Sequence, residues 1–158
     1  MVKDNEKTMD PALRRTFRFL RDGIGWRLKR LIGDQASDRF FIEMARRWRP
    51  LVNKALFVGI AGSAAKTTTK ELAVGILARQ RRVIGNPLSL NSDVEVANTI
   101  LRVRRNHDFC IAELDEQRPG AMDEPLALLQ PSIGIVTVIE NDHWTAFQSR
   151  EAIAAEVG

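Results

Sequence analysis

The sequence predicts an α/β protein whose parallel sheet is flanked by helices. From Leu56 onward, short apolar runs alternate with helix-like stretches, the rhythm of a parallel sheet with crossover helices. The apolar runs, such as 133–139, lack strict alternation of polar and apolar residues, which is typical of strands buried on both faces. A loop of small residues, 62–65, separates the first run from a helix start.

Length and composition favour a soluble globular protein. The 158 residues suit one domain, or one domain with an appendage, and 44% of them are hydrophobic and 28% charged. The apolar runs are far too short to span a bilayer, and the charged N-terminus does not fit a signal peptide, so we predict a cytoplasmic protein. The single cysteine, Cys110, excludes an internal disulfide, and its apolar neighbours indicate a buried residue rather than a nucleophile.

The charge is distributed unevenly over the chain. Residues 1–55 carry 14 Lys and Arg against 7 Asp and Glu, whereas residues 56–158 carry 10 against 13. The positive net charge of the chain, +4, therefore arises from the basic N-terminal part. We predict two units, a basic helical segment over 1–54 and an α/β domain over 55–158.

The basic segment contains two predicted helices. Apolar residues recur every three or four positions over 13–31, and a second helix covers Asp38–Trp48 and ends before Pro50. These helices could dock their apolar faces on a neighbouring domain, or residues 13–31 could lie on an anionic membrane surface as a peripheral contact. Nucleic acid is not predicted as a partner, because the pattern of basic and aromatic residues of a nucleic-acid module is missing.

The α/β part reads as four strands, each followed by a helix. The predicted strands cover 56–61, 81–85, 108–114 and 133–139, and the predicted helices cover 66–79, 93–104, 121–129 and 149–157.

The junction between the first strand and its helix has the character of a phosphate-binding loop. Free N–H groups at a helix N-terminus attract an anion, a lysine there adds a full charge, and the next hydroxyl can hold Mg²⁺. The predicted phosphate-binding residues are Gly62, Ser63, Ala64, Ala65, Lys66, Thr67 and Thr68. A phosphate loop normally has glycine where Ala65 stands, and at a positive φ the alanine costs about 1 kcal/mol and crowds the phosphate.

Polar residues also follow the later strands. Glu113 ends the strand 108–114, and because strand carboxyl ends face the ligand crevice, its carboxylate is a candidate ligand of Mg²⁺. Asp115 and Glu116 are alternatives for the same role. His143 follows the next strand beside two carboxylates and is a second candidate ligand. The polar loop 85–93 either caps the next helix or contacts a ligand, and its local sequence leaves both interpretations open.

Taken together in their order, these motifs resemble a known family. The motifs are the phosphate loop 62–71, the asparagine-containing loop 86–93, the strand end 112–114, the stretch 138–143 and the closing stretch 147–156. Over about residues 55–158 they are similar to the central ATP-binding domain of the Mur ligase family, whose fold is P-loop NTPase-like.

The resemblance implies an ATP-dependent amide ligase of peptidoglycan synthesis. In such an enzyme the γ-phosphate moves to a substrate carboxylate, and an amino acid or peptide amine attacks the acyl phosphate. By this resemblance Lys66 would hold the β- and γ-phosphates, and Thr67, Glu113 and His143 would hold Mg²⁺. Asn91 would lie near the reacting groups, and Lys66 and His143 would be the catalytic residues.

The sequence also departs from the family pattern. Ala65 and Glu95 stand where the family has glycine, and Val157 stands where it has a lysine that is carbamylated to bind a second metal. The family's flanking domains have no counterpart here, so we expect an incomplete domain without ligase turnover by itself. Two alternatives stay open, a fragment of a folylpolyglutamate, cyanophycin or poly-γ-glutamate type of ligase, and a non-catalytic interaction module. The sequence does not predict the oligomeric state.

Overall fold

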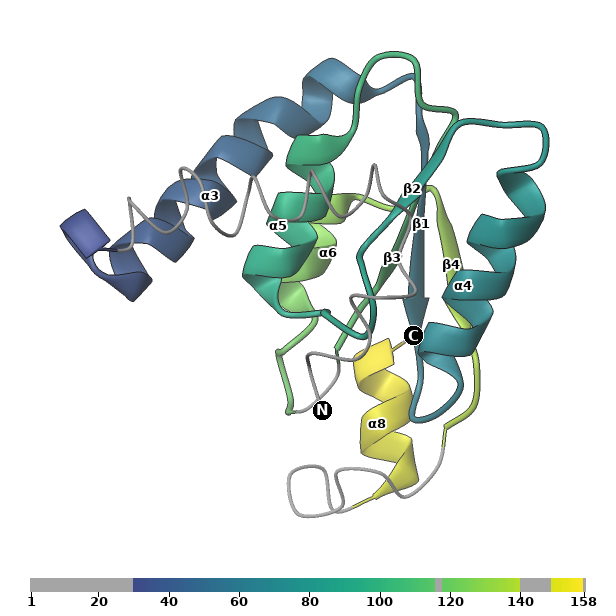
Figure 1. Cartoon of the computed structure of the whole chain (residues 1–158). Helices are drawn as coiled ribbons and strands as arrows, with labels where there is room; N and C mark the ends of the chain where they lie inside the picture. Colours follow the sequence, from purple (N-terminus) through teal and green to yellow (C-terminus); the bar gives the residue numbers. More distant parts are fainter. Residues whose placement is uncertain (1–29, 116–117, 140–148, 158) are drawn as a thin grey trace. The chain divides into compact units, whose positions relative to one another are not determined.

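The computed structural model describes residues 30–115, 118–139 and 149–157 (Figure 1). The chain divides into two compact units, and the boundary between them in the sequence lies between Phe40 and Phe41. The predicted helix over 13–31, with its proposed membrane contact, lies outside the described residues except for Arg30 and Leu31, which are helical.

The second unit is built on a parallel sheet, as the sequence predicts. The strands are β1 (Leu56–Ala61), β2 (Val83–Gly85), β3 (Phe109–Glu113) and β4 (Ile133–Val136), and their order across the sheet is β2-β3-β1-β4. All three pairings are parallel. The carboxyl ends of the four strands therefore lie at one edge of the sheet.

Helices cover both faces of this sheet (Figure 1). The helix α4 (Lys66–Leu77) packs on one face, whereas α5 (Asp93–Arg102) and α6 (Asp123–Leu129) pack together on the other. A last helix, α8 (Arg150–Val157), follows β4 in the sequence. The predicted α/β class is confirmed.

Side-chain alternation along the strands divides the core into two clusters. Phe57 and Ala61 of β1 belong to the cluster that includes residues of α5 and α6. Val58 and Ile60 point to the opposite face and pack with α4. Because β1 is buried from both sides, it carries no polar residue, which explains its continuous apolar sequence.

The strand β4 does not fit the prediction of burial on both faces. It is an edge strand of the sheet, and the side chains of Ile133 and Val136 are 44% and 47% exposed. The expectation from the apolar run 133–139 is therefore wrong for this strand, and the strand ends at Val136. The other boundaries agree with the prediction within a few residues, with β2 beginning at Val83 instead of 81.

The helix before the sheet is longer than predicted. The helix α3 covers Asp34–Trp48, and the 3₁₀ helix η3 (Arg49–Val52) follows it. Ala45 is fully buried in the same cluster as α5 and α6, and the indole Nε1 of Trp48 donates a hydrogen bond of 3.0 Å to the Val103 carbonyl. The part of α3 from Phe41 on thus docks on the α/β unit, although the functional division into 1–54 and 55–158 stays a prediction.

Arg49 anchors this connection inside the second unit. Its Nε donates to the carbonyl of Leu129 at 2.7 Å and its Nη2 to that of Gln130 at 2.9 Å. Its guanidinium carbon lies 3.5 Å from the ring centroid of Phe57. Burial lowers the pKa of Arg49. The guanidinium caps the last carbonyls of α6, where the helix dipole favours a cation.

No helix in the described ranges has the length and apolar character needed to cross a membrane.

We expect Arg49→Met to destabilise the protein by about 2–3 kcal/mol, because one buried and one partly buried carbonyl lose a charged donor and Phe57 loses its cation. The free energy of unfolding from urea titration measures the loss. The matched control is Arg46→Met, which breaks only the half-exposed ion pairs with Glu124 and Glu43 and is expected to cost less than about 1 kcal/mol. Equal losses in the two variants would contradict this account.

Candidate functional site

The candidate site lies where the four strands end. Gly62 follows β1, Asn86 follows β2, Glu113 is the last residue of β3, and Thr137 follows β4. Because the strands are parallel, these residues lie at the same edge, at the N-terminus of α4. In open α/β sheets this edge is where ligands bind.

The loop 62–65 is fixed to the segment after β4. The hydroxyl of Thr137 donates to the Ala64 carbonyl at 2.6 Å, and the amide of Ser63 donates to the Val138 carbonyl at 2.7 Å. Gly62 has a φ of +127°, and a Cβ there would collide with the Thr137 hydroxyl. Glycine is therefore required at this position by both its backbone and its neighbours.

The loop then enters α4 through a left-handed residue. Ala65 has a φ of 62° and directly precedes Lys66, the first residue of the helix. The Ala65 carbonyl accepts the first helical hydrogen bond, from the amide of Thr69 at 2.9 Å. The ammonium group of Lys66 donates to the Gly62 carbonyl at 2.6 Å and so closes the loop. A left-handed residue before a helix N-terminus turns successive N–H groups toward one point, the geometry of an anion-binding nest.

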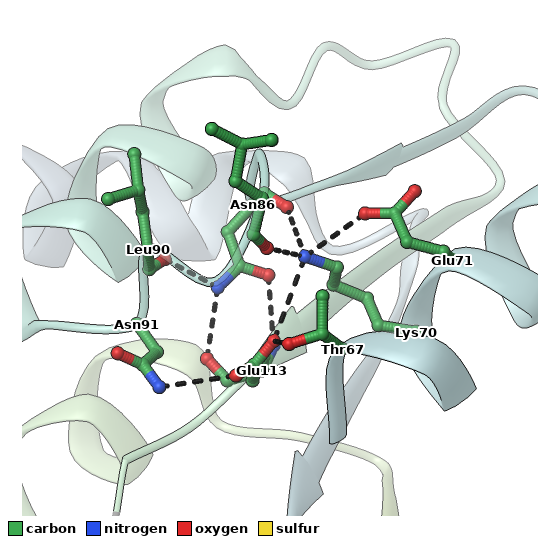
Figure 2. Close-up of polar contacts among 8 residues, drawn as sticks. Thr67, Lys70, Glu71, Asn86, Leu90, Asn91 and Glu113 are labelled. Atoms are coloured by element: carbon green, nitrogen blue, oxygen red, sulfur yellow. Dashed lines mark hydrogen bonds and ion pairs between the residues drawn. The ribbon is translucent and has the colours of Figure 1, made fainter. Parts of the chain in front are cut away.

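Three residues predicted for the site meet beside this loop (Figure 2). The hydroxyl of Thr67 donates to Oε2 of Glu113 at 2.8 Å, and Nδ2 of Asn91 donates to Oε1 of the same carboxylate at 3.3 Å. Glu113 is only 2% exposed. The carboxylate thus joins α4, β3 and the loop after β2.

Asn86 holds the main chain of Glu113 and was not among the predicted site residues. Its Oδ1 accepts a hydrogen bond from the Glu113 amide at 2.9 Å, and its Nδ2 donates to the Glu113 carbonyl at 3.0 Å (Figure 2). The same Nδ2 donates to the Leu90 carbonyl at 2.8 Å. A buried asparagine at a strand end gave a weak signal, because asparagine is equally common in turns.

Lys70 is the second residue that the sequence did not assign to the site. It is 1% exposed, and its ammonium group donates to the carbonyls of Asn86, at 2.8 Å, and Leu88. It also lies 3.2 Å from Oε1 of Glu71 and 3.8 Å from Oε2 of Glu113 (Figure 2). The signal was its spacing, since Lys70 shares a helix face with Val74 and Leu77, which pack on the sheet.

The Mur ligase middle domain family matches residues 60–157. This span contains the loop 62–65, Glu113 and the asparagine-containing loop. The chain belongs to the Mur ligase family.

Curated relatives within the family are similar over the same part of the chain. The UDP-N-acetylmuramoyl-tripeptide–D-alanyl-D-alanine ligase of Mycobacterium leprae is 38% identical over 97 residues, which are 61% of this chain and 19% of the relative. The ligase of the same name from Borreliella burgdorferi is 37% identical over 108 residues, which are 67% of this chain and 23% of the relative. The chain thus spans about a fifth of the length of these relatives.

Solved structures of Mur ligases show the same fold. MurF from Acinetobacter baumannii superposes with a TM-score of 0.72 and 25% identity, covering 77% of this chain and 27% of that one. The MurF ligase from Thermotoga maritima in complex with ADP gives a TM-score of 0.69 and 25% identity, covering 76% of this chain and 28% of that one.

The remaining predicted site residues lie apart from the Glu113 cluster or outside the described residues. Thr68 is exposed on α4. Asp115 lines a separate cavity of about 550 Å³ with Asp93, whose pKa is raised by burial and, secondarily, by Glu124. Glu116 and His143 lie outside the described residues, so the role of His143 as ligand and catalytic residue stays a prediction.

Two further findings limit the chemistry of the site. The described ranges hold no group of three or more His, Cys, Asp or Glu side chains that could bind a metal by themselves. Cys110 is fully buried in β3, and burial raises the pKa of its thiol to about 12. The thiol is therefore protonated at neutral pH, which agrees with the prediction of a buried residue rather than a nucleophile.

The departures from the Mur ligase pattern differ in their structural consequence. Ala65 occupies a left-handed position, which disfavours any residue with a Cβ. Glu95 lies in the first turn of α5, and its backbone is not left-handed. The left-handed backbone at Ala65 therefore accounts for the glycine expected there from the family resemblance. The backbone at Glu95 gives no such reason for a glycine. Val157 is the last residue of α8.

We expect Ala65→Gly to stabilise the protein by about 0.5–1 kcal/mol, because relief of the left-handed strain exceeds the entropy that glycine adds to the unfolded chain. The free energy of unfolding measures the change. Ala64→Gly, one residue earlier and without a positive φ, is the control and should destabilise by a similar amount. A loss of stability in both variants would refute the strain at Ala65.

Proposed function

We propose that this chain is the ATP-binding part of a Mur-type ligase, and that the edge around Glu113 binds the phosphates and Mg²⁺ of the nucleotide. The observation that carries the proposal is the pairing of the Thr67 hydroxyl with the buried Glu113 carboxylate, 2.8 Å apart, at the N-terminus of a helix entered through a left-handed loop. An oxygen pair at a phosphate nest has the composition of a Mg²⁺–nucleotide site.

The loop and Lys66 supply the phosphate contacts in this proposal. The N–H groups at the start of α4 carry partial positive charge, and Lys66 adds a full charge beside them. Lys66 now bonds to the Gly62 carbonyl, a neutral partner that a phosphate oxygen can replace with a stronger, charge-assisted bond. In this proposal the loop that surrounds the phosphates consists of Gly62, Ser63, Ala64 and Ala65.

The donor set fits Mg²⁺. Thr67 and Glu113 present hard oxygen atoms, and Mg²⁺ is commonly held by one or two protein oxygens together with phosphates and water, so a cluster of three carboxylates is not needed. The bound metal would neutralise charge that builds up during phosphoryl transfer. Asn91 keeps the Glu113 carboxylate oriented through its bond to Oε1.

The acceptor is proposed from the relatives. The curated relatives cited above are ligases named for a UDP-N-acetylmuramoyl-tripeptide and D-alanyl-D-alanine. We therefore propose that the γ-phosphate moves from ATP to a peptide carboxylate, which leaves ADP and an acyl phosphate. The amine of a dipeptide then attacks the acyl carbon, forms the amide bond and releases inorganic phosphate and a proton. These names favour this acceptor over the polyglutamate and cyanophycin types. The interaction through residues 13–31, the cytoplasmic location and the absence of turnover by these 158 residues stay predictions.

The test is a calorimetric titration of the chain with Mg·ATP. We expect measurable binding in the wild type and a loss of about 10-fold or more in Thr67→Ala, because the hydroxyl is a proposed metal ligand. Thr69→Ala removes a hydroxyl from the same helix and should bind like the wild type. The proposal fails if the wild type shows no binding, or if Thr67→Ala binds as tightly as the control.

A further inference from the structure

The ammonium group of Lys70 has a set of partners that phosphate binding does not require. It contacts the carbonyls of Asn86 and Leu88, and Glu71 lies at its other side. A lysine ammonium has three donors, and these partners account for all of them. The Lys70 ammonium therefore contacts the loop 86–91, which comes from a different βα unit.

This loop has a strained backbone at the point where Lys70 holds it. Leu88 has a φ of 55°, a left-handed conformation that is unfavourable for a bulky residue with a Cβ. Such a conformation persists only where neighbouring contacts enforce it. The partly buried contact between the Leu88 carbonyl and the Lys70 ammonium is such a constraint.

The loop in turn holds Glu113. Asn86 pairs with the amide and the carbonyl of Glu113, and Asn91 donates to its carboxylate. The ammonium group also lies 3.8 Å from the carboxylate itself, and both side chains are almost fully buried. A single cation on α4 thus fixes the segment that orients the proposed metal ligand (Figure 2).

We propose that Lys70 is a positioning residue, which holds the loop 86–91 against α4 and thereby sets Glu113 and Asn91 for Mg²⁺–nucleotide. The ligand in this inference, Mg²⁺–nucleotide, rests on the proposed function. The contact by which Lys70 holds the loop does not depend on that function. A neutral side chain of the same length leaves the buried carbonyl of Asn86 and the partly buried carbonyl of Leu88 without this donor, and removes the charge 3.8 Å from Glu113, so the loop is released.

The first test is hydrogen exchange of the backbone amides in Lys70→Met. We expect exchange in residues 86–91 to be about 10-fold faster or more, while the amides of β1 and β3 keep wild-type rates and report an intact sheet. Glu71→Gln is the matched control, because it removes the exposed partner of Lys70 and leaves the carbonyl contacts in place. Unchanged exchange in the loop of a folded Lys70→Met protein would overturn the proposal.

The second test separates positioning from phosphate binding. Lys70→Met should bind metal-free ADP within about twofold of the wild type but lose most of the gain in affinity that Mg²⁺ provides, whereas Lys66→Met should weaken binding with and without Mg²⁺. Equal loss in both conditions for Lys70→Met would make it a phosphate contact and overturn the proposal.

A measurement on the wild type covers the case in which Lys70→Met does not fold. Binding of Mg·ADP should slow amide exchange in 86–91, because the metal fixes Glu113 and, through it, the loop. Binding without any change in that loop would overturn the inference. If the wild type binds no nucleotide, the proposed function fails, and the exchange comparison with Glu71→Gln still decides whether Lys70 holds the loop.

Discussion

The carboxylate of Glu113 is buried at the edge where the four strands end, and the local structure satisfies this one charge. A carboxylate withdrawn from water is strongly unfavourable unless donors and a cation surround it. Thr67 and Asn91 donate to its oxygens, Asn86 pairs with its main chain, and Lys70 lies 3.8 Å away. These residues come from separate segments, so the burial of one charge ties α4 to the loop after β2.

The sheet order explains why these segments can meet. The strand β3 lies between β2 and β1, so the residue that ends β3 has the loop after β2 on one side and the loop 62–65 after β1 on the other. On the far side of β1, Thr137 fixes the loop 62–65 from the end of β4. The loop is thus held from the end of β4, and the first turn of α4 is tied to the end of β3 by the bond between Thr67 and Glu113.

The sequence predicted what depends on local pattern, and it missed what depends on which strands are neighbours. The strands, the helix starts and the proximity of Thr67 and Glu113 follow from apolar runs and from parallel strands ending at one edge. The contacts of Lys70 and Asn86 with the site depend on β2 and β3 being neighbours, and no local sequence pattern shows which strands are neighbours. The exposure of β4 was missed for the same reason, because an apolar run does not reveal whether its strand lies at an edge.

Three residues other than glycine adopt left-handed backbones in the described part of the chain, and two of them share one feature. The carbonyl of Leu88 accepts from the buried ammonium of Lys70, and that of Gln130 accepts from the buried guanidinium of Arg49. A charge-assisted bond in a low-dielectric surrounding can offset strain of this size. The third is Ala65, whose carbonyl accepts a neutral bond from the amide of Thr69. Under the proposed function, a phosphate bound by the N–H groups at the start of α4, rather than a cation on the carbonyl, would offset the strain at Ala65.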